Sequence, residues 1–102
     1  MSSASSVRVT AHADLVAIEV TGHFGFSTYQ QFREACAPVA GLRRYLIDLK
    51  GTEYMDSAAL GMLLVLRDQA GGDHADIRIV NCSPDVRKIL TIARFDQLFQ
   101  IS

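Results

Sequence analysis

One aspartate and one serine stand directly before the longest fully non-polar run of the sequence. The stretch EYMDSAALGMLLVLR contains Asp56 and Ser57, and the run extends from Ala58 to Leu66. Asp is a good N-cap, so Asp56 can accept a backbone N–H of the helix that this run predicts. Ser57 then opens the helix, where a phosphate would gain about 0.3–1 kcal/mol from the helix dipole, partly offset by repulsion from Asp56. The pair is therefore either a plain helix cap or a phosphorylation site.

Other residues that could carry chemistry are isolated. His12, His23 and His74 have no Cys or carboxylate partner at metal-ligand spacing, which predicts no metal site. Gly71-Gly72-Asp73 indicates the end of a helix, and no phosphate-binding loop motif occurs. Ser57 lacks the glycines of a nucleophile elbow. We therefore expect a protein that is not an enzyme and has no cofactor.

Length, net charge and the N-terminal residues indicate which partners to exclude and where the protein acts. The chain has 102 residues and a net charge of −1, which predicts one domain and no nucleic-acid binding. The non-polar run is too short for membrane insertion. Residues 1–6 lack the order of a signal peptide, so we expect a flexible N-terminus over 1–6, one domain over 7–102, and a cytoplasmic location. Cys36 and Cys82 are then expected to be reduced core thiols.

Hydrophobic periodicity and capping residues predict the order β-β-α-β-α-β-α-β. Expected strands are 7–11, 15–21, 45–49, 77–81 and 98–101, with a loop at 22–26. Three helices are expected. The first starts with a Ser27/Gln30 capping box and ends near 38–41, the second runs from about 57 to 70, and the third starts at Ser83-Pro84. The short turn at 13–14 favours an antiparallel hairpin, and the later alternation of strands and helices favours parallel pairing. The predicted fold class is α/β, with a mixed sheet and helices mainly on one face.

Two features leave alternatives open. The helix from Ser57 is apolar in every direction for two turns, so its outer side is either covered by a neighbouring helix or exposed as a binding patch. Gly61 costs about 1 kcal/mol within this helix, which suggests close approach by a partner or an adjacent backbone. Asp48 lies in an apolar strand, where it either bonds to the loop from Thr52 to Asp56 or is exposed at a sheet edge.

The segment YLIDLKGTEYMDSAALGMLL, followed by SPDVRKIL, resembles the STAS domain family of anti-sigma factor antagonists over about residues 7–101. The resemblance implies a bacterial signalling phosphoprotein that regulates transcription by partner switching. It implies that the unphosphorylated domain binds a serine kinase that is also an anti-sigma factor, that phosphorylation on Ser57 releases it, and that a PP2C-type phosphatase resets it. The implied partner-binding residues are Asp56, Ser57, Ala58, Leu60, Gly61 and Met62 on the helix, with His23 and Phe24 in a loop near the acceptor.

The sequence departs from the family pattern at three places. Ala58-Ala59 replaces the usual Ser/Thr-Gly after the acceptor, and Gly25 stands where the loop usually carries Asp. Because the sequence ends at Ser102, we expect the family's usual C-terminal helix to be missing or vestigial. The stretch GHFGFSTYQQFR resembles stand-alone STAS regulators of biofilm pathways. An alternative function is a constitutive docking subunit of a transport or sensory assembly, and the oligomeric state stays open.

Overall fold

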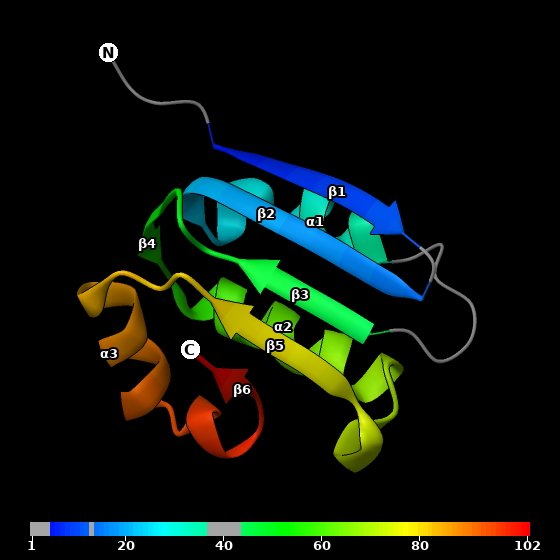
Figure 1. Ribbon diagram of the computed structural model, residues 1–102. Helices are drawn as coiled ribbons and strands as arrows, with labels where there is room; N and C mark the ends of the chain where they lie inside the picture. Colours follow the sequence, from blue (N-terminus) through cyan, green and yellow to red (C-terminus); the bar gives the residue numbers. More distant parts are fainter. Residues whose placement is uncertain (1–4, 13, 37–43) are drawn as a thin grey trace.

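A mixed β-sheet backed by helices makes up the structure, a computed structural model that describes residues 5–12, 14–36 and 44–102 (Figure 1). The strands are β1 (Ser6–His12), β2 (Leu15–Phe24), β3 (Arg44–Asp48), β4 (Thr52–Met55), β5 (Asp76–Val80) and β6 (Gln100–Ile101). The helices are α1 (Tyr29–Cys36), α2 (Ser57–Gln69) and α3 (Pro84–Ile92), with short 3-10 helices η1 (Phe26–Thr28), η2 (Gly72–His74) and η3 (Phe95–Gln97).

The sheet combines one antiparallel hairpin with parallel pairs. Its order is β1-β2-β3-β5-β6, with β4 pairing with β2 beyond the end of β3. β1 and β2 are antiparallel, and the other pairs are parallel. The predicted α/β class and mixed sheet are therefore confirmed. Four of the five predicted strands agree with the structure within two residues at each end, whereas the second ends three residues later than expected.

The core lies between the sheet and helices α1 and α2, which run behind the sheet in Figure 1. Along β2, Val16, Ile18 and Val20 are buried while Glu19 is exposed, because alternate side chains of a strand point to opposite faces. From α2, the buried side chains are Ala59, Met62, Leu63 and Leu66. α3 packs near β4 at the end of the sheet. The helices thus cover mainly one face, as predicted.

β2 is longer than the sequence pattern predicted. The expected loop at 22–26 begins only after Phe24, because the unpredicted strand β4 pairs with the end of β2. His23 is opposite Tyr54 and Phe24 is opposite Met55 in this pairing. β4 has buried residues only at its two ends, so it carries no alternation that would identify a strand.

The start of α1 also differs from the prediction. Ser27 lies inside η1, and Thr28 performs the capping: its Oγ1 accepts the Gly25 N–H at 3.0 Å. Gln30 bonds to Glu34 at 3.3 Å instead of reaching back. The predicted Ser27/Gln30 capping box is therefore wrong, because the chain first turns through η1. The predicted end of this helix at 38–41 lies outside the described residues.

Asp48 follows neither of the two interpretations that the sequence left open. Its carboxylate accepts hydrogen bonds from the Lys50 N–H at 2.9 Å and from the Asn81 side-chain amide at 3.1 Å. β3 lies between β2 and β5, so Asp48 is not at a sheet edge. These two hydrogen bonds join the carboxyl ends of β3 and β5, and neither reaches the segment from Thr52 to Asp56.

The N-terminal segment is ordered from Ser5 onward. Ser6 begins β1, and the Ser5 hydroxyl accepts the His23 N–H at 3.0 Å. Residues 1–4 of the predicted N-terminal segment lie outside the described residues. Cys82 is partly buried against the core, and burial raises the pKa of its thiol. The side chain of Cys36 lies outside the description. No helix in the described part of the chain is long and apolar enough to cross a membrane.

Candidate functional site

The predicted helix cap is present at the N-terminus of α2. Asp56 adopts an extended backbone, and its Oδ1 accepts the N–H of Ala58 at 2.9 Å and that of Ala59 at 3.2 Å. Two of the N–H groups that have no partner within the helix are thereby satisfied. Ser57 is the first helical residue and is exposed. Its hydroxyl therefore lies at the positive end of the helix dipole, open to an approaching protein.

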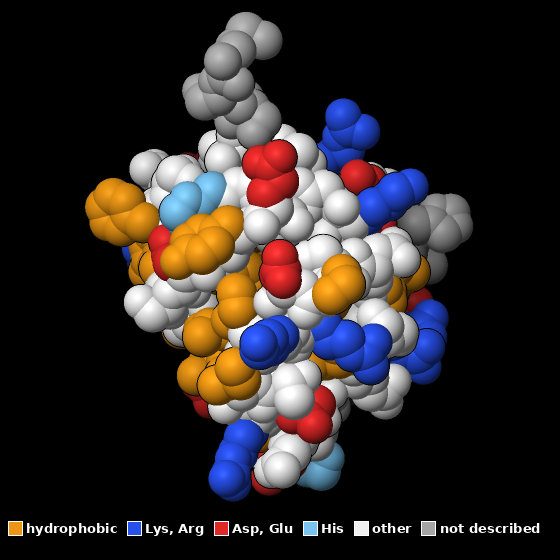
Figure 2. All heavy atoms as spheres, turned by 90° about the vertical axis from the view of Figure 1, so that its left-hand side faces the viewer, with side chains coloured by type: hydrophobic (Ala, Val, Ile, Leu, Met, Phe, Trp, Pro, Cys, Tyr) orange, Lys and Arg blue, Asp and Glu red, His pale blue; other side chains and the backbone are white. Residues whose placement is uncertain are grey.

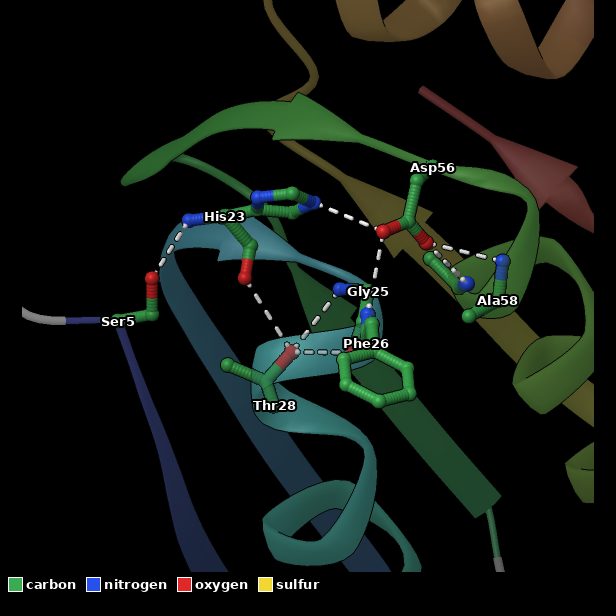
Figure 3. A network of polar contacts seen from close by, with 8 residues as sticks. Ser5, His23, Gly25, Phe26, Thr28, Asp56 and Ala58 are labelled. Carbon is green, nitrogen blue, oxygen red and sulfur yellow. Dashed lines mark hydrogen bonds and ion pairs between the residues drawn. The ribbon is translucent and has the colours of Figure 1, made fainter.

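The second oxygen of Asp56 joins the helix to the loop after β2. Oδ2 accepts the Phe26 N–H at 3.1 Å and forms a hydrogen bond with His23 Nε2 at 2.9 Å. The backbone N–H of Asp56 donates to the Phe24 carbonyl at 3.2 Å. Figure 3 shows the carboxylate between these groups. We call these contacts of the Asp56 carboxylate, with Ala58, Ala59, Phe26 and His23, the Asp56 junction.

The Asp56 junction keeps its carboxylate ionised. Burial is the largest single influence and would raise the pKa of Asp56, but hydrogen bonds from Phe26, His23, Ala59 and Ala58 together outweigh it. The pKa is therefore lower than that of an ordinary aspartate, because the charged form receives these donors. Near neutral pH the carboxylate can act only as an acceptor, so the His23 ring nitrogen donates.

Gly25 makes room for the Asp56 carboxylate. A Cβ at this position would lie 2.2 Å from Cγ, Oδ1 and Oδ2 of Asp56, closer than real Cβ contacts. The absence of a side chain at Gly25 therefore has a structural consequence. It allows the loop backbone to approach the helix cap directly, and any side chain there would separate them.

Further contacts fix the loop around His23. The Thr28 hydroxyl lies 3.2 Å from both the His23 and the Gly25 carbonyls. The Tyr54 ring meets the His23 ring edge-on, with centroids 5.0 Å apart and an interplanar angle of 83°. Ser5 accepts the His23 N–H as described above. The loop is thus tied to the residue before β1, to β4, to η1 and to α2.

The structure separates the predicted partner-binding residues into exposed and buried groups. Ser57 and Gly61 are exposed, and Asp56, Ala58, Leu60 and His23 are partly buried. In contrast, Met62 is 5% exposed and Phe24 is fully buried. Both side chains are core residues here, so a partner cannot reach them without rearrangement.

Phe26 is the exposed aromatic residue of this loop, and sequence reasoning missed it. Phe24 packs against Phe32 with ring centroids 5.1 Å apart, whereas Phe26 is 83% exposed. The sequence did contain a signal for the position of Phe24. The buried residues Val16, Ile18 and Val20 alternate along β2, and continuing this alternation to the end of the strand places Phe24 on the buried face. Figure 2 shows hydrophobic side chains gathered near a histidine on this end of the molecule.

The outer face of α2 is partly uncovered. Leu64 and Val65 are 43% and 57% exposed, and a groove of about 670 Å³ runs between α1 and α2 past Tyr29, Gly61 and Val65. A Cβ on Gly61 would meet nothing within 4 Å. Among the described residues, no adjacent backbone therefore explains this glycine. The apolar residues of α2 therefore lie partly in the core and partly on the surface.

Within residues 5–12, 14–36 and 44–102, no three His, Cys, Asp or Glu side chains come together in a group that could hold a metal ion. The chemistry of this end of the molecule thus consists of a fixed carboxylate, an exposed hydroxyl and exposed aromatic rings.

Solved structures show which class of protein has this fold. An anti-sigma factor antagonist from Mycobacterium paratuberculosis superposes with a TM-score of 0.79 at 19% identity, covering 99% of this chain and 89% of that one. The anti-sigma factor antagonist SpoIIAA in its unphosphorylated form gives 0.78 at 18% identity, covering 95% and 88%. At these identities the likeness shows the fold, which is that of anti-sigma factor antagonists.

Sequence comparison shows the family. The family model described as Mlab, STAS domain matches residues 7–100. A STAS-domain containing protein of Pseudomonas aeruginosa (strain UCBPP-PA14) is 52% identical over 94 residues, which cover 91% of this chain and 93% of that protein. The chain belongs to the STAS domain family, as the motif around Ser57 predicted.

Proposed function

We propose that this protein is a partner-switching regulator controlled by phosphorylation of Ser57. In its unphosphorylated form it binds a serine kinase of the anti-sigma factor type and thereby frees the kinase's other client. Phosphorylation of Ser57 releases it, and a PP2C-type phosphatase restores the binding form. The observation that carries the proposal is the exposed Ser57 at the first position of α2, beside a fixed Asp56, in a fold shared with anti-sigma factor antagonists.

The proposed modification is a transfer of the γ-phosphoryl group of ATP to the Ser57 oxygen. A bond forms between Ser57 Oγ and the γ-phosphorus, and the bond from that phosphorus to the β–γ bridging oxygen breaks, with the electron pair leaving on ADP. A base on the kinase takes the hydroxyl proton. The phosphatase reverses the modification with water, which supplies oxygen to the phosphorus and a proton to Ser57, so that inorganic phosphate leaves. The protein itself is the substrate, not an enzyme, and a kinase that uses ATP acts in the cytoplasm.

The effect of the phosphate follows from local charge. It adds about −1.5 to −2 charges next to the ionised Asp56, on a side chain that is exposed rather than packed. The fold is therefore expected to stay the same, since no buried contact is broken. A surface that fits the neutral hydroxyl would have to desolvate these charges or face their repulsion, which costs several kcal/mol at an interface.

A second candidate function is a constitutive docking subunit of a transport or sensory assembly. It is favoured by the exposed Leu64 and Val65 and by the groove between α1 and α2, which lie along the helix rather than at its phosphorylatable end. In this function the state of Ser57 would not change binding.

Titration of the cognate kinase with the wild type, two Ser57 variants and one control variant separates the two functions. The switch predicts that Ser57→Ala binds like the wild type and that Ser57→Asp binds at least about 100-fold more weakly, with thermal melts unchanged. Gln97→Glu, which adds one negative charge at an exposed position of η3, is the matched control and should bind like the wild type. Equal binding by all four proteins would favour constitutive docking.

A further inference from the structure

Phe26 is the most exposed large hydrophobic residue among those the structure describes. It is 83% exposed, compared with 73% for Ile92 and 57% for Val65. A single exposed apolar residue is common on protein surfaces and by itself indicates nothing. Three other observations give this residue a meaning: its backbone is fixed, it bonds to Asp56, the residue that directly precedes Ser57, and the same carboxylate bonds to His23, whose ring contacts the exposed Tyr54.

The backbone of Phe26 is held in place on both sides. Its N–H donates to Asp56 Oδ2 at 3.1 Å, and its carbonyl accepts the Tyr29 N–H at the end of η1. The preceding Gly25 donates its N–H to Thr28 Oγ1 at 3.0 Å. An aromatic side chain on an ordered turn loses little conformational entropy when a partner covers it. Aromatic side chains, Phe included, are enriched at protein–protein interfaces, where a few residues carry most of the binding energy.

Phe26 and Ser57 flank the same carboxylate. Asp56 accepts the Phe26 N–H (Figure 3). Asp56 also directly precedes Ser57 in the chain. An enzyme that transfers a phosphoryl group to Ser57 must enclose the hydroxyl to exclude water, so it must cover this corner of the molecule. The groove between α1 and α2, in contrast, extends away from Ser57 along the helix.

We propose that Phe26 is the anchor through which the serine kinase binds this protein, and that His23 is a positioning residue that holds Phe26 in place through Asp56. This inference rests on the proposed function and names the contact that the kinase makes. His23 is suited to this role, since its ring reaches Asp56 at 2.9 Å while its edge contact with Tyr54 fixes the ring plane. Tyr54 is 54% exposed and adds a second exposed aromatic ring, in contact with His23.

The initial rate of phosphate transfer to Ser57 tests the inference. Purified, unphosphorylated full-length variants are added at low concentration to an extract of the native cells with labelled ATP, and the site is confirmed by fragmentation. The early rate is insensitive to the phosphatase and reports recognition by the cell's own kinase. Phe26→Ala should lower the rate at least about tenfold, as expected for loss of a hot spot. Ile92→Ala, which removes a similarly exposed residue from α3, should stay within about twofold of the wild type.

The His23 variants distinguish positioning from direct contact. His23→Ala should lower the rate several-fold, whereas His23→Gln, whose amide can still donate to Asp56, should recover most of it. Thermal melts of all variants check that the fold is kept. Phe26→Ala phosphorylated at the wild-type rate would overturn the inference and leave the switch intact. A wild-type protein that receives no phosphate on Ser57 would overturn the proposed function, and the inference with it.

Discussion

Substitution of Gly25 by Ala tests whether the Asp56 junction stabilises the fold. The new Cβ would lie 2.2 Å from the Asp56 carboxylate, whereas ordinary contacts are 3.4–4 Å. The loop and the cap must therefore separate by more than 1 Å, the difference between 3.4 and 2.2 Å. The bonds of Asp56 to Phe26 and His23, now 3.1 and 2.9 Å, would then exceed hydrogen-bonding distance.

Three contributions determine how far Gly25→Ala lowers the free energy of unfolding: the lost hydrogen bonds, the relaxation of the loop and the entropy of the unfolded chain. A hydrogen bond to a charged group contributes about 1.5–3 kcal/mol. Two such bonds are at risk, although relaxation of the loop will preserve part of this energy. Replacing glycine also restricts the unfolded chain, which returns about 0.4–1 kcal/mol. We therefore expect Gly25→Ala to lower the free energy of unfolding by about 2–3 kcal/mol, and the melting temperature by about 10 °C or more in a domain of this size.

Urea denaturation of matched glycine variants measures this cost. Gly61→Ala is the control, since a Cβ there meets nothing within 4 Å inside α2; it should raise the free energy of unfolding by about 0.5–1 kcal/mol. In an Asp56→Ala background the carboxylate is gone, so Gly25→Ala should cost almost nothing. A Gly25→Ala protein as stable as the wild type, or an equal cost in both backgrounds, would refute the reasoning.

Three further predictions follow from the same contacts. Asp56→Asn should destabilise the protein at neutral pH. The difference in unfolding free energy between the wild type and this variant should shrink as the pH falls below about 4 and through the lower pKa of Asp56 in the folded state, because a carboxylate with a lowered pKa stabilises the fold only while it is ionised. A difference that stays constant from pH 7 to 2 would contradict the assignment. Ser57→Asp should leave the melting temperature within about 2 °C of the wild type by circular dichroism, since Ser57 is exposed, and a much larger fall would show a structural role for the hydroxyl. Ser83→Ala should cost about 1 kcal/mol in urea denaturation, since its hydroxyl accepts the Val86 N–H at the start of α3, and an unchanged midpoint would argue against that cap.

The parts of the fold that depend on local patterns were predictable. α2 begins at Ser57 because Asp56 is a capping residue followed by an apolar run, and α3 begins at Pro84 for the equivalent reason. The hairpin followed from two strands with a short turn. In each case the residues that determine the element are neighbours in the sequence, so propensity and spacing suffice.

The Asp56 junction could not be predicted in the same way. Asp56 meets Phe26 and His23 across 30 and 33 residues, and these contacts need β4 to pair with the end of β2. β4 has no alternating pattern of its own and is a strand because of its neighbour. The sequence alone locates Ser57 and its helix cap. The loop that surrounds them, including the outward position of Phe26, required the tertiary structure.

The most direct test of the switch is the mass of the protein isolated from its native cells, growing and starved, with the modified residue mapped by fragmentation. The account predicts one added phosphate, located on Ser57, with an occupancy that differs between the two conditions. A protein that is unmodified at Ser57 in both conditions would contradict the switch, and Asp56 and Ser57 would then be the start of a helix and nothing more.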